Sequence, residues 1–271
     1  MSRADALRSL QDKLRLEREF KKGLDKISDD ISKDYVEGIL NLGNYDDILD
    51  GSLKDHYQIV GDEFSTRIGE KLKEEKKPTG SEIEEIAAAL LLYYLVRAPK
   101  QRKHIQDTTA KNIIEADKYG KEYAAQEAEQ GRRVSAQEEK IVAGNKLNQH
   151  LKGRAGTIAA RETQDVAETA KHAEVSVLTG GKPDFIVNNR NHVGVKKRWW
   201  TKGDELVRRY GRDEFDHVTA DQQEVDTNSP FSVSGESLMY PGDENLGASL
   251  GNIINCRCGA EYNIIDVEKL R

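Results

Sequence analysis

The residues of this sequence with the most distinctive chemistry are two cysteines and one histidine. Cys256 and Cys258 are separated by one residue and are the two cysteines of the 271-residue chain. His217 lies upstream, at the end of the run Asp213-Glu214-Phe215-Asp216-His217. Two thiolates and an imidazole suit a zinc ion, with an aspartate or a water molecule as fourth ligand.

The spacing of the cysteines favours a simpler interpretation. Paired zinc-binding cysteines are usually separated by about two to four residues, whereas here the separation is one. On a strand, the two side chains would share one face at roughly 6.5–7 Å, which strains a mutual disulfide. We therefore expect free, buried cysteines that pack as small apolar side chains, with no metal and no cofactor. Zinc bound by His217, Cys256 and Cys258 is the alternative.

Asp213 and His217 are four residues apart, a spacing that on a helix lets a carboxylate orient an imidazole. A zinc- or His/Asp-dependent hydrolase built from these two residues and the cysteines is therefore one functional alternative. The sequence has no nucleophile elbow, no paired-histidine zinc motif, no dinucleotide fingerprint, no complete phosphate loop and no calcium loop. We expect a protein that is not an enzyme.

A basic segment lies at residues 190–212 of a chain whose formal net charge is −6. Clustered cations neutralise phosphates, and Trp199 and Trp200 in the same segment can stack on bases. Alternatively, at least one tryptophan belongs to the core and the cations form a solvated face or contact an acidic protein. The expected DNA- or partner-contact residues are Lys196, Lys197, Arg198, Lys202, Arg208, Arg209 and Arg212.

Up to about residue 178, apolar residues recur at helical spacing. Steps of three and four place two sets of them on helical stripes: Leu7, Leu10 and Leu14, then Phe20, Leu24, Ile27, Ile31 and Tyr35. The other faces of this long helix are charged. The pattern predicts an arm that buries its apolar stripe against another chain or against the rest of this one.

Further helices follow a linker at residues 76–80. Ser81 and Glu84 have capping-box spacing, and the run at 83–96 is apolar nearly all round. We expect this run to be the most buried element and to end before Pro99. Three more helices are predicted over residues 105–128, 135–150 and 158–178, the second capped by Ser135 and Glu138 and the third stopped by Gly180 and Gly181.

Beyond residue 181 the sequence changes to turns and short β-like runs. Strands are predicted at residues 185–187, 197–201, 231–233, 238–240 and 257–264, and short helices at 204–210 and 213–218. The fold class expected is α+β, with long helices in the N-terminal region and a small α+β domain after them. The longest apolar run, residues 86–96, is about half the roughly twenty residues that a membrane span needs.

The C-terminal third also contains an ordered set of short motifs. It reads Lys197-Arg198-Trp199-Trp200-Thr201, Asp213 with His217, 221–225, Pro230-Phe231, 235–243 and Ile254-Asn255-Cys256-Arg257-Cys258. As a set, over roughly residues 155–260, it resembles the phage Mu F-like head morphogenesis domain. The family motif positions are Trp199, Asp213, His217, Pro241, Gly242, Asp243, Asn255, Cys256, Arg257 and Cys258. One departure is Gln222, where the family usually has a glycine that suits a tight turn.

The resemblance implies a structural minor head protein of a tailed bacteriophage, with no established catalytic activity. Expected partners are the portal protein or the major capsid protein, and phage DNA during packaging or ejection. The expected location is the virion head near the portal, and the host cytoplasm during assembly, without a membrane. The domains expected are a helical arm at 1–75, a helical region at 76–154 and the Mu F-like domain at 155–271. A non-specific nucleic-acid-binding module is a further alternative.

Overall fold

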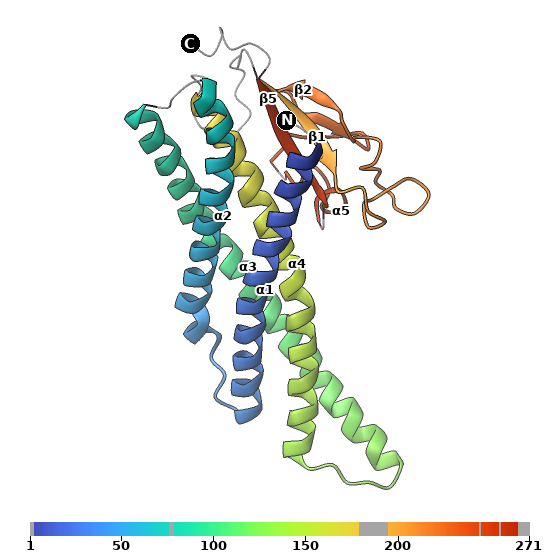
Figure 1. The fold of residues 1–271 in the computed structure, drawn as a ribbon. Coiled ribbons are helices and arrows are strands. Elements are labelled where there is room, and N and C mark those ends of the chain that lie inside the picture. Colours follow the sequence, from blue (N-terminus) through green and yellow to red (C-terminus); the bar gives the residue numbers. More distant parts are fainter. Residues whose placement is uncertain (1–2, 76–78, 179–194, 244, 255, 265–271) are drawn as a thin grey trace. The chain divides into compact units, whose positions relative to one another are not determined.

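The protein has an α+β fold, with long helices in the N-terminal region and a small sheet region after them (Figure 1). The computed structural model describes residues 3–75, 79–178, 195–243, 245–254 and 256–264. Its elements are α1 (Arg3–Glu37), a 3-10 helix (Leu42–Tyr45), α2 (Asp46–Glu75), α3 (Gly80–Glu129), α4 (Ala136–Leu178), β1 (Val195–Thr201), β2 (Glu224–Asp226), β3 (Phe231–Val233), β4 (Glu236–Leu238), α5 (Leu250–Ile253) and β5 (Cys258–Ile264). This confirms the predicted fold class. No helix in the described ranges combines the length and the apolar character that crossing a membrane requires.

The chain divides into two compact units, each built from separate stretches of sequence. The sheet unit comprises Met1–Leu16, His56–Tyr94 and Ala160–Arg271, and the helix unit comprises Glu17–Asp55 and Leu95–Ala159. Each of the four long helices contributes one part to each unit. The units are therefore not divided at the boundaries expected after residues 75 and 154.

Within the helix unit, the apolar stripe of α1 is buried as predicted. Phe20, Leu24, Ile27, Ile31 and Tyr35 all lie in the core. The Tyr35 hydroxyl donates a hydrogen bond to Asp117 of α3, and its ring lies 5.9 Å from the Lys140 ammonium of α4. The stripe is thus buried against the rest of this chain. Burial against another chain was the other possibility that the sequence left open.

Helix α3 does not end before Pro99, so that prediction is wrong. It is one helix of 50 residues with Pro99 inside it. A proline removes one helical hydrogen bond and crowds the preceding turn, at a cost of about 3 kcal/mol. Ala98 and Ile105, on either side of the proline, are buried in the helix unit. Tertiary packing of this kind can outweigh the local cost of the proline.

The apolar run of α3 is also not the most buried element. Leu91, Leu92, Leu95 and Val96 each leave half or more of their surface exposed. A run that is apolar all round has no periodicity to indicate which side faces solvent. The prediction of full burial rested on the average hydropathy of the run alone, and for that reason it was wrong. The N-terminal cap lies two residues earlier than predicted. Thr79 donates from its backbone N–H (2.7 Å) and its hydroxyl (3.0 Å) to the Glu82 carboxylate.

Helix α4 is continuous where two helices were predicted. The Glu138 N–H donates to the Ser135 hydroxyl at 3.1 Å, which confirms the predicted cap. Gly153 and Gly156 lie inside the helix and do not break it. The predicted stop at Gly180 and the predicted strand at 185–187 lie outside the described residues, as does Asn255.

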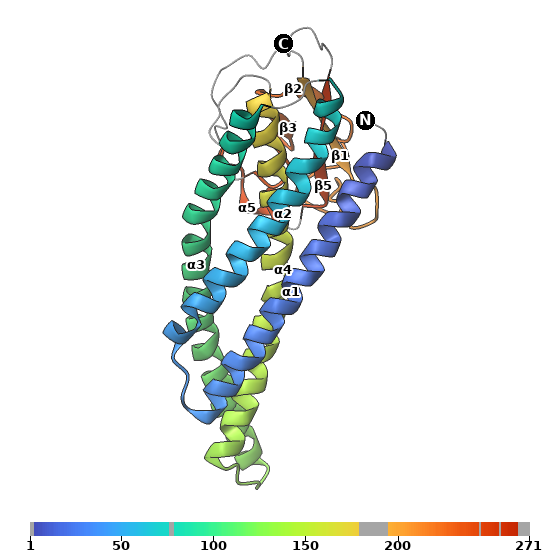
Figure 2. The ribbon, with the colours of Figure 1, turned by 60° about the vertical axis from the view of Figure 1, so that its left-hand side comes forward.

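A three-stranded antiparallel sheet, in the order β2-β1-β5, forms the centre of the sheet unit. β1 and β5 lie side by side in both views, with Trp199 opposite Ala260 (Figures 1 and 2). The predicted strands at 197–201, 231–233 and 257–264 are confirmed. The predicted strand at 238–240 lies instead at 236–238, since Ser234 and Gly235 have positive φ values of 52° and 82° and form a two-residue hairpin turn.

The short helices predicted at 204–210 and 213–218 are wrong, because these residues form turns. Aspartate side chains accept hydrogen bonds from backbone N–H groups two or three residues further on and so compete with helix formation. Asp204 accepts from Leu206 at 3.1 Å, Asp213 from Phe215 at 3.2 Å, and Asp216 from Thr219 at 3.1 Å.

The burial of the α1 stripe generates a matched test with two isoleucines. Ile31 is 4% exposed and Ile39, just beyond the helix, is 62% exposed. Ile31→Ala should lower the free energy of unfolding by about 2–4 kcal/mol, because it leaves a cavity. Ile39→Ala should change it by less than about 0.5 kcal/mol. Chemical denaturation measures both values, and equal losses would contradict the assigned packing.

Candidate functional site

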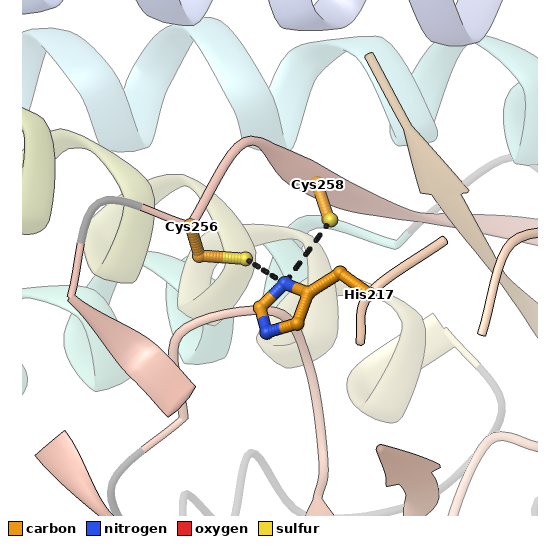
Figure 3. A group of neighbouring side chains, drawn as sticks. All are labelled: His217, Cys256 and Cys258. Atoms are coloured by element: carbon orange, nitrogen blue, oxygen red, sulfur yellow. Dashed lines mark hydrogen bonds between the residues drawn. The ribbon is translucent and has the colours of Figure 1, made fainter. Parts of the chain in front are cut away.

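His217, Cys256 and Cys258 gather at one point of the sheet unit (Figure 3). The His217 Nδ1 atom lies 3.5 Å from the Cys256 sulfur and 3.6 Å from the Cys258 sulfur. The three potential ligand atoms all lie within 4.8 Å of one another. His217 and Cys258 are buried, and Cys256 is half-buried. The structure therefore brings together the three residues of the zinc alternative.

The separation of 6.5–7 Å expected for the cysteines on a strand is wrong. Cys258 is the first residue of β5, but Cys256 precedes the strand. Its side chain is therefore not held to the alternation of the strand. His217 is held in place by its backbone N–H, which donates to the Arg208 carbonyl at 3.0 Å.

The His217 ring is oriented by Asn252 of α5. The Asn252 side-chain NH2 group donates to the Val233 carbonyl at 3.1 Å and to the Glu236 carboxylate at 2.8 Å. Its amide oxygen therefore faces His217 Nε2, 2.7 Å away, and accepts the proton of that nitrogen. When the ring is neutral, Nδ1 consequently offers its lone pair to the two sulfurs.

The pKa values of the two cysteine thiols shift in opposite directions. A hydrogen bond from Cys258, reinforced by His217, lowers the pKa of the Cys256 thiol well below its usual value. Burial, together with the neighbouring Cys256 charge, raises the pKa of Cys258. Burial opposes the charging of His217, but the interactions with Cys256 and Asn252 outweigh it and raise the pKa of the imidazole. The group therefore favours negative charge on Cys256 beside a cation.

Asn252 was not identified from the sequence, and Asp213 does not orient His217, as the hydrolase alternative would require. Asp213 is exposed and accepts from the Phe215 N–H, with Arg208 at 3.9 Å. That alternative needed a helix at 213–218, which does not form. Asn252 lies in a four-residue helix, too short to leave a periodic signal in the sequence.

Aromatic and charged motif residues surround the group. The Trp199 ring makes edge contacts with His217, at 5.8 Å between centroids, and with Phe231, at 5.2 Å. The Lys197 ammonium is buried and donates to the Met239 carbonyl at 2.7 Å. Burial lowers the pKa of Lys197 to about 7, although Asp243 opposes the shift. Lys197 is therefore a core residue, which removes it from the expected contact surface.

The Pro241-Gly242-Asp243 turn fits against α4. The Pro241 carbonyl accepts from Gln164 at 2.7 Å, and a Cβ at Gly242 (φ +91°) would lie 3.1 Å from the Gln164 side chain. Asp243 accepts from the Met239 N–H at 2.8 Å and so closes the turn. Arg257 forms an ion pair with Asp204 at 2.6 Å. These motif residues hold loops in place.

Most of the remaining basic residues have acidic or backbone partners. Arg198 pairs with Glu224 at 2.6 Å, and Lys196 lies 3.9 Å from the same carboxylate. Lys202 lies 3.4 Å from Asp204, and Arg208 donates to the Ile254 carbonyl at 2.6 Å. Arg209 and Arg212 are exposed. The predicted contact with DNA or an acidic partner stays a prediction, with these last two residues the most accessible.

Both tryptophans of the basic segment are buried, which confirms that at least one belongs to the core. The Arg198 guanidinium lies 5.8 Å from the Trp200 ring centroid. Neither ring is available for base stacking in this conformation. Both tryptophans therefore serve packing here, although strand alternation by itself accounts for only one of them.

Polar residues of α4 form a second group that sequence analysis missed. Between residues 162 and 178 every residue of α4 is buried. Tyr57 donates to Glu162 at 2.6 Å, and His56 contacts Thr163 at 2.9 Å. In sequence, such residues look like the solvated face of a surface helix, and no local signal distinguishes the two cases.

Other polar residues of α4 bind the edge of β5. The Lys13 ammonium of α1 donates to Glu168 at 2.9 Å and to the Cys258 carbonyl at 3.0 Å. Lys171 donates to the Ala260 carbonyl at 2.6 Å, and Glu168 accepts from the Ala260 N–H at 3.1 Å. Burial opposes the charging of Glu168, but the two lysines outweigh it and lower the pKa of the carboxyl. The site is thus anchored to a buried ionic network.

No protein-family model, curated protein or solved structure matches the chain. The resemblance to the Mu F-like domain therefore depends on the ordered motif residues alone. In the structure, those motif residues that are described belong to the sheet unit, and the buried ones pack around His217, Trp199 and the Pro241 turn.

Gln222 adopts the backbone conformation that the family usually provides with glycine. Its φ is +65°, its N–H donates to the Trp199 carbonyl at 2.8 Å, and the Gln223 N–H donates to the Ala220 carbonyl at 2.9 Å. The tight turn is therefore present even though the residue has a side chain. A non-glycine residue in this region is strained by about 1 kcal/mol.

The strain at Gln222 predicts that a substitution to glycine stabilises the protein. Gln222→Gly should raise the free energy of unfolding by about 0.5–1 kcal/mol, because glycine adopts positive φ without steric cost. Gln222→Ala is the matched control: it removes the same polar group but keeps the strain, so it should give no such gain. Chemical denaturation of both variants checks the prediction. Destabilisation by Gln222→Gly would show that the side chain contributes more than the strain costs.

Proposed function

We propose that the chain is a structural minor head protein of a tailed bacteriophage, acting in head assembly at or near the portal, and that it is not an enzyme. The observation that carries the proposal is the role of the motif residues in the sheet unit. Lys197, Trp199 and Asp243 are buried and hold strands and turns together. Such roles suit a domain that must present a fixed shape to other proteins.

Exposed apolar side chains on α3 support a role in assembly. Leu91, Leu92, Leu95 and Val96 follow one another at helical spacing along one side of the helix, each half or more exposed. Contiguous exposed apolar residues are characteristic of surfaces that bind other proteins. In this proposal they contact the portal protein or the major capsid protein within the virion head.

Contact with phage DNA is a secondary part of the proposal. Arg209 and Arg212 are exposed, and a weak, salt-dependent attraction to phosphates follows from such a pair. The net charge of −6 opposes tight, non-specific binding to a polyanion. An assembly role that depends on contacts with other proteins is therefore better supported than a role as a nucleic-acid-binding module.

The proposal predicts that heads produced from the genome encoding the chain contain it. Mass spectrometry of purified heads should detect the wild-type chain, and Leu92→Glu with Val96→Glu should abolish or strongly reduce its incorporation. Ile114→Glu, on the same helix and 69% exposed, is the matched control and should be incorporated normally. Circular dichroism of the purified variants should match the wild type, because the substituted side chains are exposed.

Absence of the wild-type chain from both heads and assembly intermediates would contradict the proposed function. Normal incorporation of the α3 double variant, with the chain present in heads, would leave the function standing and show that another surface makes the contact.

A further inference from the structure

We propose that His217, Cys256 and Cys258 bind a zinc ion. This inference goes beyond the proposed function and does not depend on it. The sequence favoured packing of free cysteines over metal binding. The observations that reverse this preference are the distances between the donor atoms, the orientation of the imidazole and the net charge of the site.

The donor distances are those of a tetrahedral zinc centre. Zinc bonds of about 2.3 Å to sulfur and about 2.0–2.1 Å to nitrogen, at the tetrahedral angle, place the nitrogen about 3.6 Å from each sulfur. His217 Nδ1 lies 3.5 Å from the Cys256 sulfur and 3.6 Å from the Cys258 sulfur. Both sulfurs therefore lie at the distance from the imidazole nitrogen that two zinc ligands would have, and within 4.8 Å of each other.

The second shell fixes the imidazole as a metal ligand requires. Metal-binding histidines usually donate their other ring N–H to an oxygen acceptor, which fixes the tautomer and the ring orientation. Here Asn252 accepts from Nε2 at 2.7 Å and is itself held by Glu236 at 2.8 Å. The lone pair of Nδ1 is thereby directed at the two sulfurs (Figure 3).

Free cysteines would satisfy this geometry by a chain of hydrogen bonds, from Cys258 to Cys256 and between Cys256 and Nδ1, which leaves the close approach of the Cys258 sulfur to Nδ1 without a bond of its own. One nitrogen lone pair accepts one good S–H hydrogen bond, yet two sulfurs lie at nearly equal distances from Nδ1. A catalytic thiol activated by His217 as a base is a further alternative. It would require only one sulfur beside the imidazole, whereas two are present. A single ion between the three atoms satisfies all of them.

The charge and the chemical class of the donors select zinc. Two thiolates and a neutral imidazole balance the two positive charges of the ion, so the buried site carries no net charge. Thiolate ligands favour zinc over magnesium or calcium, which prefer oxygen. Among the residues described, no further His, Cys, Asp or Glu donor joins the group. A water molecule on the side of half-buried Cys256 can complete the coordination.

The ion would connect two separate parts of the sheet unit, the turns after β1 and the segment that leads into β5. His217 belongs to the turns that follow β1, Cys256 to the segment after α5, and Cys258 to β5. A metal bond between such segments replaces packing that short turns cannot provide. The ion would hold these segments together, and its loss should loosen the C-terminal part of the chain. Its fourth position, open to water, is one that structural zinc sites usually fill with a protein ligand.

The test is the metal content of the full chain produced with zinc in the medium and purified without a chelator. Elemental analysis should find about one zinc per chain. Cys258→Ser and His217→Asn should each lose the zinc. His172→Asn, a buried histidine of the same unit that contacts Tyr262 at 3.4 Å, is the matched control and should keep it. Cobalt(II) in place of zinc should give the visible absorption of a tetrahedral thiolate complex.

A measurement on the wild-type protein tests the proposal without any variant, and so does not depend on whether the variants fold. Titration of the two thiols with an organic mercurial should release the zinc in step with the thiols that react. Zinc that dialysis removes, thiols that react without releasing metal, or zinc retained by Cys258→Ser would each overturn the proposal. None of these results depends on whether the chain enters phage heads.

Discussion

The sheet unit depends on how the outer edge of β5 is satisfied. β5 is an edge strand that pairs with β1 on one side, and a buried edge cannot leave its backbone groups unpaired. Lys13, Glu168 and Lys171 take the place of a missing strand by binding the carbonyls and the N–H at Cys258 and Ala260. Removing one member of such a buried ionic network leaves an uncompensated charge, at a cost of about 3–5 kcal/mol. The network therefore holds β5 against the N-terminal part of α1, which carries Lys13, and the C-terminal part of α4, which carries Glu168 and Lys171.

The candidate zinc site inherits its geometry from this constraint. The Cys258 carbonyl accepts from Lys13 and Gln164, while the sulfur of the same residue faces His217. On the other side, Asn252 and Glu236 position the imidazole through the β3–β4 hairpin and α5. The motif residues that carry the resemblance to phage head proteins thus act chiefly by keeping strands and turns in place. That is the basis for favouring an assembly role over catalysis.

Sequence patterns predicted the parts of this structure that local periodicity controls. The α1 stripe, the Ser135 cap and the strand at 231–233 have local signals of this kind and were identified correctly. The buried polar residues of α4 were missed because buried Glu168 and Lys171 are indistinguishable in sequence from solvated residues. The passage of α3 through Pro99 and the role of Asn252 were missed because they depend on tertiary contacts. For the site, the sequence identified His217 and both cysteines but not their mutual distances, and so favoured the wrong geometry for the cysteine pair.

Amide hydrogen exchange of β5 in the Glu168→Ala variant tests the central constraint most directly. In the wild type, the Ala260 N–H donates to Glu168, whereas the N–H groups of Gly259 and Glu261 point toward β1. The account predicts that the Ala260 amide loses protection in the variant, and loses more of it than its two neighbours. Unchanged protection of Ala260 would contradict the claim that the buried network holds the edge of the sheet.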